Sequence, residues 1–253
     1  IEGKPTLMPL LHGVIGVQHG SMAVYNAYAD RVPVYIILGN SLDAATRRPG
    51  AEWYHSVQDC VAMVRDYTKW DDLPASLPHF AESTVRAYKI AMTPPYGPVL
   101  LVVDADLQEG PRKSFNARQK LEIPKKPIIT PPIGDINALN EAAKLLVNAT
   151  NPVIVAGRHT FNEEGIRNLV ELAEALQCPV IDQGARMNFP SRHPLAMRDR
   201  GRPLMNQADV ILALEAGDVW GPGLELVRQG VERGALEAHF ENHVATAPPW
   251  RHR

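Results

Sequence analysis

Cysteine is scarce in this sequence. Cys60 and Cys178 are the only two among 253 residues, and they lie far apart and outside any C-x-x-C spacing. A secreted domain held together by disulfides is therefore excluded, and the pattern fits a reducing cytoplasm better than an oxidising exterior. We expect two free thiols and a cytoplasmic protein.

The sequence also lacks a surplus of charge and any long apolar run. It has 26 Lys and Arg against 28 Asp and Glu, so neither a nucleic-acid partner nor an acidic tail is indicated. No apolar stretch approaches the ~20 residues that span a bilayer, and no secretory signal is recognisable, so we expect no membrane partner. A small molecule or another protein chain is the expected partner. Because the sequence begins at Ile1, we expect part of a longer protein or a processed product.

Two runs of helix and strand signals are present. The first run predicts a helix over 21–30, a strand over 34–38, a short helix over 56–64, a strand over 65–70, a helix over 74–92 and a strand over 97–104. The first helix is expected to follow a turn at Gly20 and to bury Met22, Val24, Tyr25 and Tyr28. The strand over 34–38 is apolar throughout, which is typical of a parallel strand covered on both faces. The loop over 39–55 follows its carboxyl end, where open α/β sheets bind ligands.

The second run begins after a segment, 108–134, in which prolines and basic residues cluster and periodicity disappears, as in an interdomain linker. Asp135 is a plausible N-cap for a helix over 136–149. Further elements are expected as a strand over 152–157, a helix over 162–177, a strand over 178–183 and a strand over 208–215, with no apolar strand after Gly221. Strands that alternate with helices predict an α/β fold with two doubly wound parallel-sheet domains, 1–107 and 135–253, joined by a proline-rich linker.

The segment "QHGSMAVYNAYADRVPVYIILGN" resembles the pyrimidine-binding domain of thiamine-diphosphate enzymes, in particular the acetolactate synthase-like large chains. In that family a glycine turn opens a helix that ends in Ala-Asp, and a Val-Pro pair leads into a buried strand that ends in glycine. The matching positions are Gly20, Ala29, Asp30, Val32, Pro33 and Gly39. "HSVQD" is similar to the family's Phe-Gln-Glu loop, "RDYTKW" and "GPVLLVVDADLQE" to later strands, and "NPVIVAGRHT" and "ADVILALEAGDVWG" to strands of the central domain. The resemblance runs from about Lys4 to about Gly221.

This resemblance implies a pyrimidine-binding domain that lacks its N-terminal part, followed by a central domain with an atypical C-terminal tail. The full-length family decarboxylates a 2-oxo acid and transfers the product to a carbonyl acceptor, using thiamine diphosphate and Mg²⁺. The family's cofactor-activating glutamate has no counterpart here, since only Glu2 precedes Gly20 and it stands at the wrong place. The Gly-Asp-Gly and Asn motif that holds Mg²⁺ is also missing. We therefore expect the chain to be inactive alone, and to form a homo-oligomer or to associate with a chain that carries the diphosphate-binding domain.

The residues implied for cofactor binding are Gly20, Ser21, Met22 and Asn26. A glycine lets the backbone approach a flat ring, and the first turn of a helix offers free N–H groups and the positive end of the helix dipole. The plainer alternative is that Gly20 forms a tight turn packed against a neighbouring helix.

The candidate catalytic residues are Gln58, which the resemblance implies faces the substrate, and His55, whose titratable ring in a loop with Trp53 and Tyr54 suits a proton-transfer group. The alternative for His55 is a loop histidine bonded to solvent or backbone. Arg47 and Arg48 suit a substrate carboxylate, or are simply solvated.

Two other patterns are weaker. Gly157 is followed by Arg158 and His159, so the G-x-G-x-x-G fingerprint fails and FAD is not expected, although Arg158 and Arg186 leave a different nucleotide site open. His239 and His243 have the spacing of a zinc pair on a helix, but no H-E-x-x-H motif is present and no metal site is expected. A non-catalytic α/β scaffold or nucleotide-binding module is the alternative function.

Overall fold

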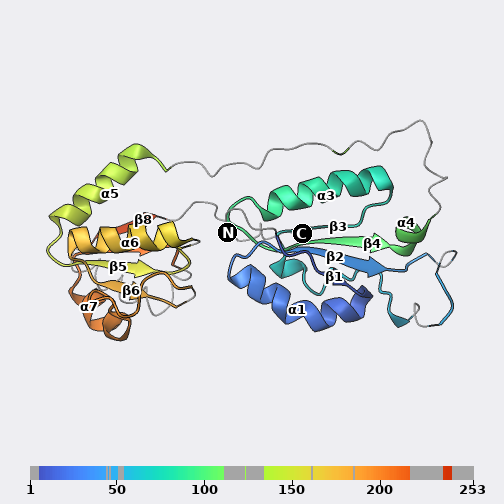
Figure 1. The fold of residues 1–253 in the computed structure, drawn as a ribbon, viewed down its shortest axis with the longest axis horizontal. Helices are drawn as coiled ribbons and strands as arrows, with labels where there is room; N and C mark the ends of the chain where they lie inside the picture. Colours follow the sequence, from blue (N-terminus) through green and yellow to red (C-terminus); the bar gives the residue numbers. More distant parts are fainter. Residues whose placement is uncertain are drawn as a thin grey trace. The chain divides into compact units, whose positions relative to one another are not determined.

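The fold is a computed structural model that describes residues 6–43, 45, 47–50, 54–110, 123, 134–160, 162–184 and 186–216, and the backbone of 236–240. The described residues form two compact units, within 6–123 and within 134–240 (Figure 1). Among these residues, no helix is long and apolar enough to cross a membrane. Each unit is built on one sheet with helices on both faces, which is the α/β architecture that the sequence predicts.

The first unit contains a four-stranded sheet in the order β1-β2-β4-β3, in which all strands are parallel. Its elements are β1 (Leu10–Leu11), α1 (Gly13–Ala29), β2 (Tyr35–Asn40), the 3-10 helix η1 (Arg65–Tyr67), β3 (Trp70–Asp72), α3 (Leu77–Ala91), β4 (Val99–Asp104) and α4 (Ala105–Glu109). Helix α1 covers one face of the sheet and α3 the other (Figure 1). The continuous apolar runs of β2 and β4 are therefore buried on both sides.

Alternate strand residues of the first unit enter two separate layers of core. Ile36, Leu38 and Leu100 pack with Val17 of α1 and with Cys60 of the following loop. Residues one position along these strands pack against α3; they are Tyr35, Val99 and Leu101, in contact with Ala87 and Ala91. This period of two is what parallel strands between two helical layers require.

The second unit repeats the plan with a parallel sheet in the order β6-β5-β7-β8. Its elements are α5 (Ile136–Asn148), β5 (Pro152–Ala156), α6 (Glu163–Leu176), β6 (Val180–Asp182), η3 (Arg198–Arg200), α7 (Gly201–Gln207), β7 (Val210–Leu214) and β8 (Leu236–Phe240). Leu146 and Leu169, from α5 and α6, pack on one face of β5, and α7 lies against the other face (Figure 1). The Asp135 cap is confirmed, because its carboxylate accepts hydrogen bonds from the N–H groups of Asn137 and Ala138 at 2.8 and 3.0 Å.

Several local expectations are wrong. The residues over 59–64 form turns instead of a helix, and 65–67 form η1 instead of a strand. The cause is a set of side-chain bonds: Asp59 accepts from the N–H of Ala62 and receives both terminal nitrogens of Arg65 at 2.8 Å, which competes with helical pairing. Met22 and Tyr25 are exposed instead of buried.

The last element of each unit also differs from expectation. Gln108 and Glu109, expected to begin the linker, complete helix α4, and the linker beyond Gly110 lies almost wholly outside the described residues. After Gly221 the sequence predicts no apolar strand, and the structure has a strand of mixed polarity, Leu236–Phe240, which pairs in parallel with β7 at the edge of the sheet. Both cysteines are free, as the sequence predicts, and both are buried. Burial raises the pKa of both thiols, that of Cys178 to about 12.

Candidate active site

The polar residues of the first unit gather where its parallel strands end. His12 follows β1, Asn40 ends β2 and Asp104 ends β4, with Asn40 directly opposite Asp104 in the strand register. The carboxyl ends of parallel strands meet at one edge of the sheet, which is where open α/β folds bind their ligands. This edge is the candidate active site.

Helix α1 begins at this edge with Gly13, and His12 is its N-cap. Gly13 has φ +43°, and a Cβ added there would lie 2.7 Å from the carbonyl oxygen of His55. The same carbonyl accepts a hydrogen bond from the N–H of Val14 at 3.3 Å. Glycine is therefore required at position 13 for two reasons, its backbone conformation and the close approach of the His55 loop.

The glycine that opens the helix is thus Gly13, and the placement of Gly20 in a turn is wrong. Gly20 lies in the middle of α1, where a Cβ would meet only Leu11 Cδ1 at 3.5 Å. At 1.5 Å per residue, Gly20 is about 10 Å along the helix from Gly13, and Asn26 about 20 Å. The free N–H groups of the first turn belong to residues near Gly13. Gly20 and Ser21 are therefore too far along the helix to offer such groups to a ligand.

Ser21, Met22 and Asn26 have other surroundings. The Ser21 hydroxyl lies 2.6 Å from the Tyr67 hydroxyl, which itself donates to the Met63 carbonyl at 2.8 Å, so Ser21 is the donor of the pair. Met22 and Asn26 are exposed on α1. The structure does not bring these three residues together with His55, and their contact with a cofactor stays a prediction.

His55 is paired with a histidine that the sequence analysis did not single out. The His12 Nε2 and His55 Nδ1 atoms lie 2.9 Å apart, and the two rings meet edge to face with centroids separated by 5.0 Å. The pair lies at the start of α1, beside the carboxyl end of β1. The available signal was the order of an apolar strand followed by His-Gly, "PLLHGV", which is the strand–glycine–helix pattern itself.

A second anchor holds the same loop two residues later. Asn40, only 5% exposed, donates from Nδ2 to the Val57 carbonyl at 3.1 Å. Among the described residues, its buried Oδ1 has no hydrogen-bond partner. The same holds for Oδ1 of Asp104, whose Oδ2 accepts from the N–H of Leu42 at 3.0 Å. Gln58, the next residue of the loop, is exposed. Two buried acceptor atoms therefore lie at this edge beside an anchored loop.

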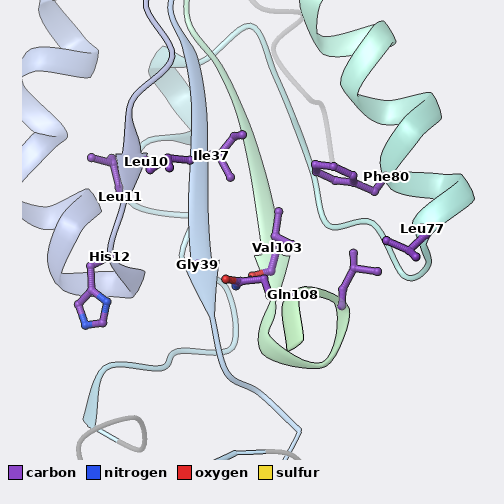
Figure 2. A pocket seen from close by; sticks show the side chains of 10 residues that line it. Leu10, Leu11, His12, Ile37, Gly39, Leu77, Phe80, Val103 and Gln108 are labelled. Atoms are coloured by element: carbon purple, nitrogen blue, oxygen red, sulfur yellow. The ribbon is translucent and has the colours of Figure 1, made fainter. Parts of the chain in front are cut away.

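A pocket of about 460 Å³ opens on the α3 side of this edge. Figure 2 shows Leu77 and Phe80 of α3 on one side of it and the strand residues Leu10, Ile37 and Val103 on the other. The lining is mainly apolar, and the Gln108 amide donates to the Val103 carbonyl at 2.6 Å. The pocket supplies shape and apolar surface, while the polar groups lie at its His12 end.

Among the arginines suggested for a substrate carboxylate, Arg48 is already in an ion pair, with Glu109 at 2.5 Å, and both side chains are exposed. The backbone N–H of Arg47 donates to the Asp43 carbonyl at 2.9 Å. Tyr54 is 73% exposed, and Trp53 lies outside the described residues. These contacts give no support to a carboxylate clamp in this loop.

In the second unit, Gly157 packs against protein backbone. A Cβ at this position would fall on the Glu215 carbonyl oxygen and within 2.8 Å of Ala216 Cα. His159, two residues further on, is half-buried, and burial lowers its pKa. Arg158 Nε is buried and has no hydrogen-bond partner among the described residues.

A pocket of about 280 Å³ lies near the end of β6 in this unit. Its polar lining includes Asp182, Arg198 and Arg200. Of the proposed zinc pair, His239 lies in strand β8, so the helical spacing argument is wrong, and His243 lies outside the described residues. Among the described residues, no group of three or more His, Cys, Asp or Glu is arranged to hold a metal ion.

Lys69, in the segment "RDYTKW", has a structural role. Its ammonium donates to the carbonyls of Ile90 and Thr93 at 2.6 and 2.7 Å, where α3 ends. Burial lowers its pKa from 10.5 to about 8. The side chain therefore stabilises a helix terminus and does not face the candidate site's histidine pair.

This pKa gives a testable pH dependence. Folding depresses the pKa, so the unfolded chain binds more protons than the folded chain between about pH 8 and 10.5. The free energy of unfolding should rise with pH across this window, with a slope of at most about 1.4 kcal/mol per pH unit, and the gain should disappear as the pH falls through 8. Denaturant unfolding of the wild type and of Lys69→Met across pH 7–10.5 checks this. A difference between the two proteins that stays constant with pH would contradict it.

Comparisons with known proteins agree on one family. Residues 139–217 match the family model described as thiamine pyrophosphate enzyme, central domain. A sulfoacetaldehyde acetyltransferase of Rhodobacter capsulatus is 31% identical over 211 residues, covering 79% of this chain and 33% of the relative. A probable acetolactate synthase large subunit of Methanocaldococcus jannaschii is 28% identical, covering 69% of this chain and 29% of the relative.

A solved structure shares the fold. It is a putative thiamin diphosphate-dependent enzyme from Mycobacterium smegmatis, with a TM-score of 0.62 and 24% identity, covering 81% of this chain and 39% of that one. The chain spans about a third of the length of the curated relatives it matches.

Proposed function

We propose that this chain, which belongs to the thiamine-diphosphate-dependent enzyme family, forms the pyrimidine side of an acetolactate synthase-like active site. The reaction proposed is decarboxylation of a 2-oxo acid and transfer of the product to a carbonyl acceptor. One observation carries the proposal: at the carboxyl edge of the sheet, α1 begins at Gly13, and the His55 loop is hydrogen-bonded to the start of α1 and to β2. A cytoplasmic location belongs to the same proposal and is supported by two free, buried thiols.

The residues at this edge suit the aminopyrimidine ring. An amino group is a hydrogen-bond donor, and the buried Oδ1 atoms of Asn40 and Asp104 are acceptors that have no partner in the part of the chain that the structure describes. Gly13 and Gly39 keep side chains away from the ends of β1 and β2. When bound, the cofactor supplies an electron sink for decarboxylation. In this proposal, the residues at the edge of the sheet hold the pyrimidine ring, and His55 and Gln58 orient the substrate.

The diphosphate and Mg²⁺ do not fit these residues. The nearest sequence matches, Gly134-Asp135-Ile136 and Gly217-Asp218-Val219, lack the second glycine of the family's motif. Mg²⁺ needs several oxygen ligands in nearly octahedral geometry. We therefore propose that Mg²⁺, the diphosphate contacts and the activating glutamate come from protein outside these 253 residues, in a homo-oligomer or a partner chain.

Isothermal titration calorimetry tests this division. The 253-residue chain, shown to be folded by circular dichroism, should give no saturable heat with thiamine diphosphate and Mg²⁺, because diphosphate contacts are absent. The matched control is a full-length relative under the same conditions, which should bind. Micromolar binding by the 253-residue chain would contradict the proposal.

A second candidate function is a non-catalytic nucleotide-binding module. It is favoured by the buried Nε of Arg158, which has no partner within the described ranges, and, independently, by the pocket that Arg198 and Arg200 line near the end of β6. Guanidinium groups are suited to bidentate phosphate binding. Titration with ADP in the same calorimeter separates the two functions. Binding of ADP that Arg198→Ala abolishes would favour the module.

A further inference from the structure

We propose that His12 is a positioning residue that holds the neutral His55 ring with its proton on Nε2, so that His55 acts as a hydrogen-bond donor toward a substrate oxygen. The assignment of the substrate rests on the proposed function, whereas the assignment of the proton rests on the geometry of this chain alone. Donation of a hydrogen bond, with no transfer of the proton, replaces the role of proton carrier expected for His55 from the sequence.

The backbone of His55 is fixed at the start of α1. Its carbonyl accepts from the N–H of Val14 at 3.3 Å, and only the missing Cβ of Gly13 permits the two segments to lie so close. Two residues further on, Asn40 holds the carbonyl of Val57 at 3.1 Å. With the backbone held at His55 itself and two residues later, the remaining freedom of His55 is the rotation and protonation of its ring.

His12 removes this freedom. A hydrogen bond of 2.9 Å joins His12 Nε2 to His55 Nδ1, and two neutral imidazoles can share it in only two ways. Either His12 Nε2–H donates and the His55 proton lies on Nε2, or His55 Nδ1–H donates and His55 Nε2 is a bare acceptor. The two arrangements give His55 opposite chemistry at its free nitrogen.

The field of helix α1 selects the first arrangement. His12 is the N-cap of a helix of 17 residues, and its side chain makes no capping hydrogen bond, so the helix acts on the ring through its field alone. Nδ1, bonded to the ring carbon that carries the side chain, is the ring nitrogen nearer to the backbone. The free N–H groups and the positive dipole end of the helix favour a lone pair at that nitrogen and disfavour a second N–H there. The His12 proton is then on Nε2, from which it donates to His55 Nδ1, and His55 keeps its own proton on Nε2.

This arrangement matches the proposed substrate class. The carbonyl and carboxylate oxygens of a 2-oxo acid are acceptors only, so a fixed N–H donor complements them and a bare nitrogen does not. A donor that is already oriented also stabilises negative charge that develops on a substrate oxygen. His55 therefore orients and polarises the substrate, and His12 acts by fixing the His55 ring.

The test is nitrogen-15 NMR of the histidine rings in the full 253-residue chain at alkaline pH, where imidazoles are neutral, with no cofactor added. The long-range proton–nitrogen pattern of His55 should show Nε2 carrying the proton and Nδ1 bare. In His12→Phe this single pattern should be lost to a mixture of both tautomers. In His12→Gln, whose amide can still donate, the wild-type pattern should be retained.

The matched control is His19→Gln, which replaces an exposed histidine of the same helix and should leave the His55 signals unchanged. Backbone amide spectra report whether each variant is folded, and His12→Gln keeps the test decisive if His12→Phe unfolds. A His55 proton on Nδ1, or a pattern that His12→Phe leaves intact, would overturn the proposal. Because the readout needs neither cofactor nor substrate, its failure is distinct from failure of the proposed function.

Discussion

Replacing Gly13 with alanine should lower the free energy of unfolding of the first unit by about 2 kcal/mol or more. Two effects add at this position. The backbone has φ +43°, which alanine adopts only with strain, and the new Cβ would lie 2.7 Å from the His55 carbonyl oxygen. The contact is with backbone, so it can be relieved only by moving the loop or the start of α1. Loss of the Val14–His55 hydrogen bond should follow.

Hydrogen exchange measured by mass spectrometry localises this effect. In Gly13→Ala, the amides at the start of α1 should exchange faster, while those of β5 in the second unit stay as in the wild type. The matched control is Gly20→Ala, in the middle of the same helix, where the nearest atom is 3.5 Å from the new Cβ. That variant should be more stable than the wild type by up to about 1 kcal/mol. Equal destabilisation by both variants would be incompatible with a helix that begins at Gly13.

Replacing Gly157 with alanine should destabilise the second unit still more, by roughly 3 kcal/mol or more. The added Cβ would overlap the Glu215 carbonyl and approach Ala216 Cα to 2.8 Å. Glu215 itself has φ +50°, and the N–H of Arg158 donates to its carbonyl at 3.0 Å. The ends of β5 and β7 must therefore separate to admit one methyl group.

Gly165→Ala is the matched control in this unit. Its Cβ would lie 3.5 Å from Asn162 Oδ1, an ordinary contact, and the hydrogen bond from the Gly165 N–H to this cap would remain. We expect a change within about 1 kcal/mol. Exchange rates of the β5 and β7 amides report the result for this unit separately. A Gly157→Ala protein with wild-type protection in both strands would show that the two backbone segments are not in contact.

Sequence patterns predict correctly those elements whose structure depends only on their own residues and not on contacts with distant ones. The apolar runs of β2, β4, β5 and β7 are sufficient, because a strand buried on both faces needs no alternation. Asp135 is likewise identifiable from the sequence as an N-cap, because an aspartate directly precedes a helical pattern. The start of α1 was misplaced because glycines at 13, 16 and 20 and the β-branched residues between them have weak helix propensity. Packing of Val14 and Val17 against the sheet overrides that propensity.

The candidate site was only partly accessible to the same reasoning. His55 was singled out, but its partner His12 is 43 residues away, and no spacing rule links residues across a crossover. The Asn40 contact with Val57 likewise depends on the path of a long loop. Strand β8 was missed because "LEAHF" has no apolar run and pairs at the edge of its sheet.

The anchoring of the His55 loop has a thermodynamic consequence for ligand capture. Its backbone is tied to α1 through Val14 and to β2 through Asn40, before any ligand is bound. Ordering a loop and its side chains opposes association by about 0.5–1.5 kcal/mol for each side chain immobilised. Because this loop is already held at both positions, binding incurs less of that entropic cost. A small, weakly interacting substrate can therefore bind to groups that are already correctly oriented.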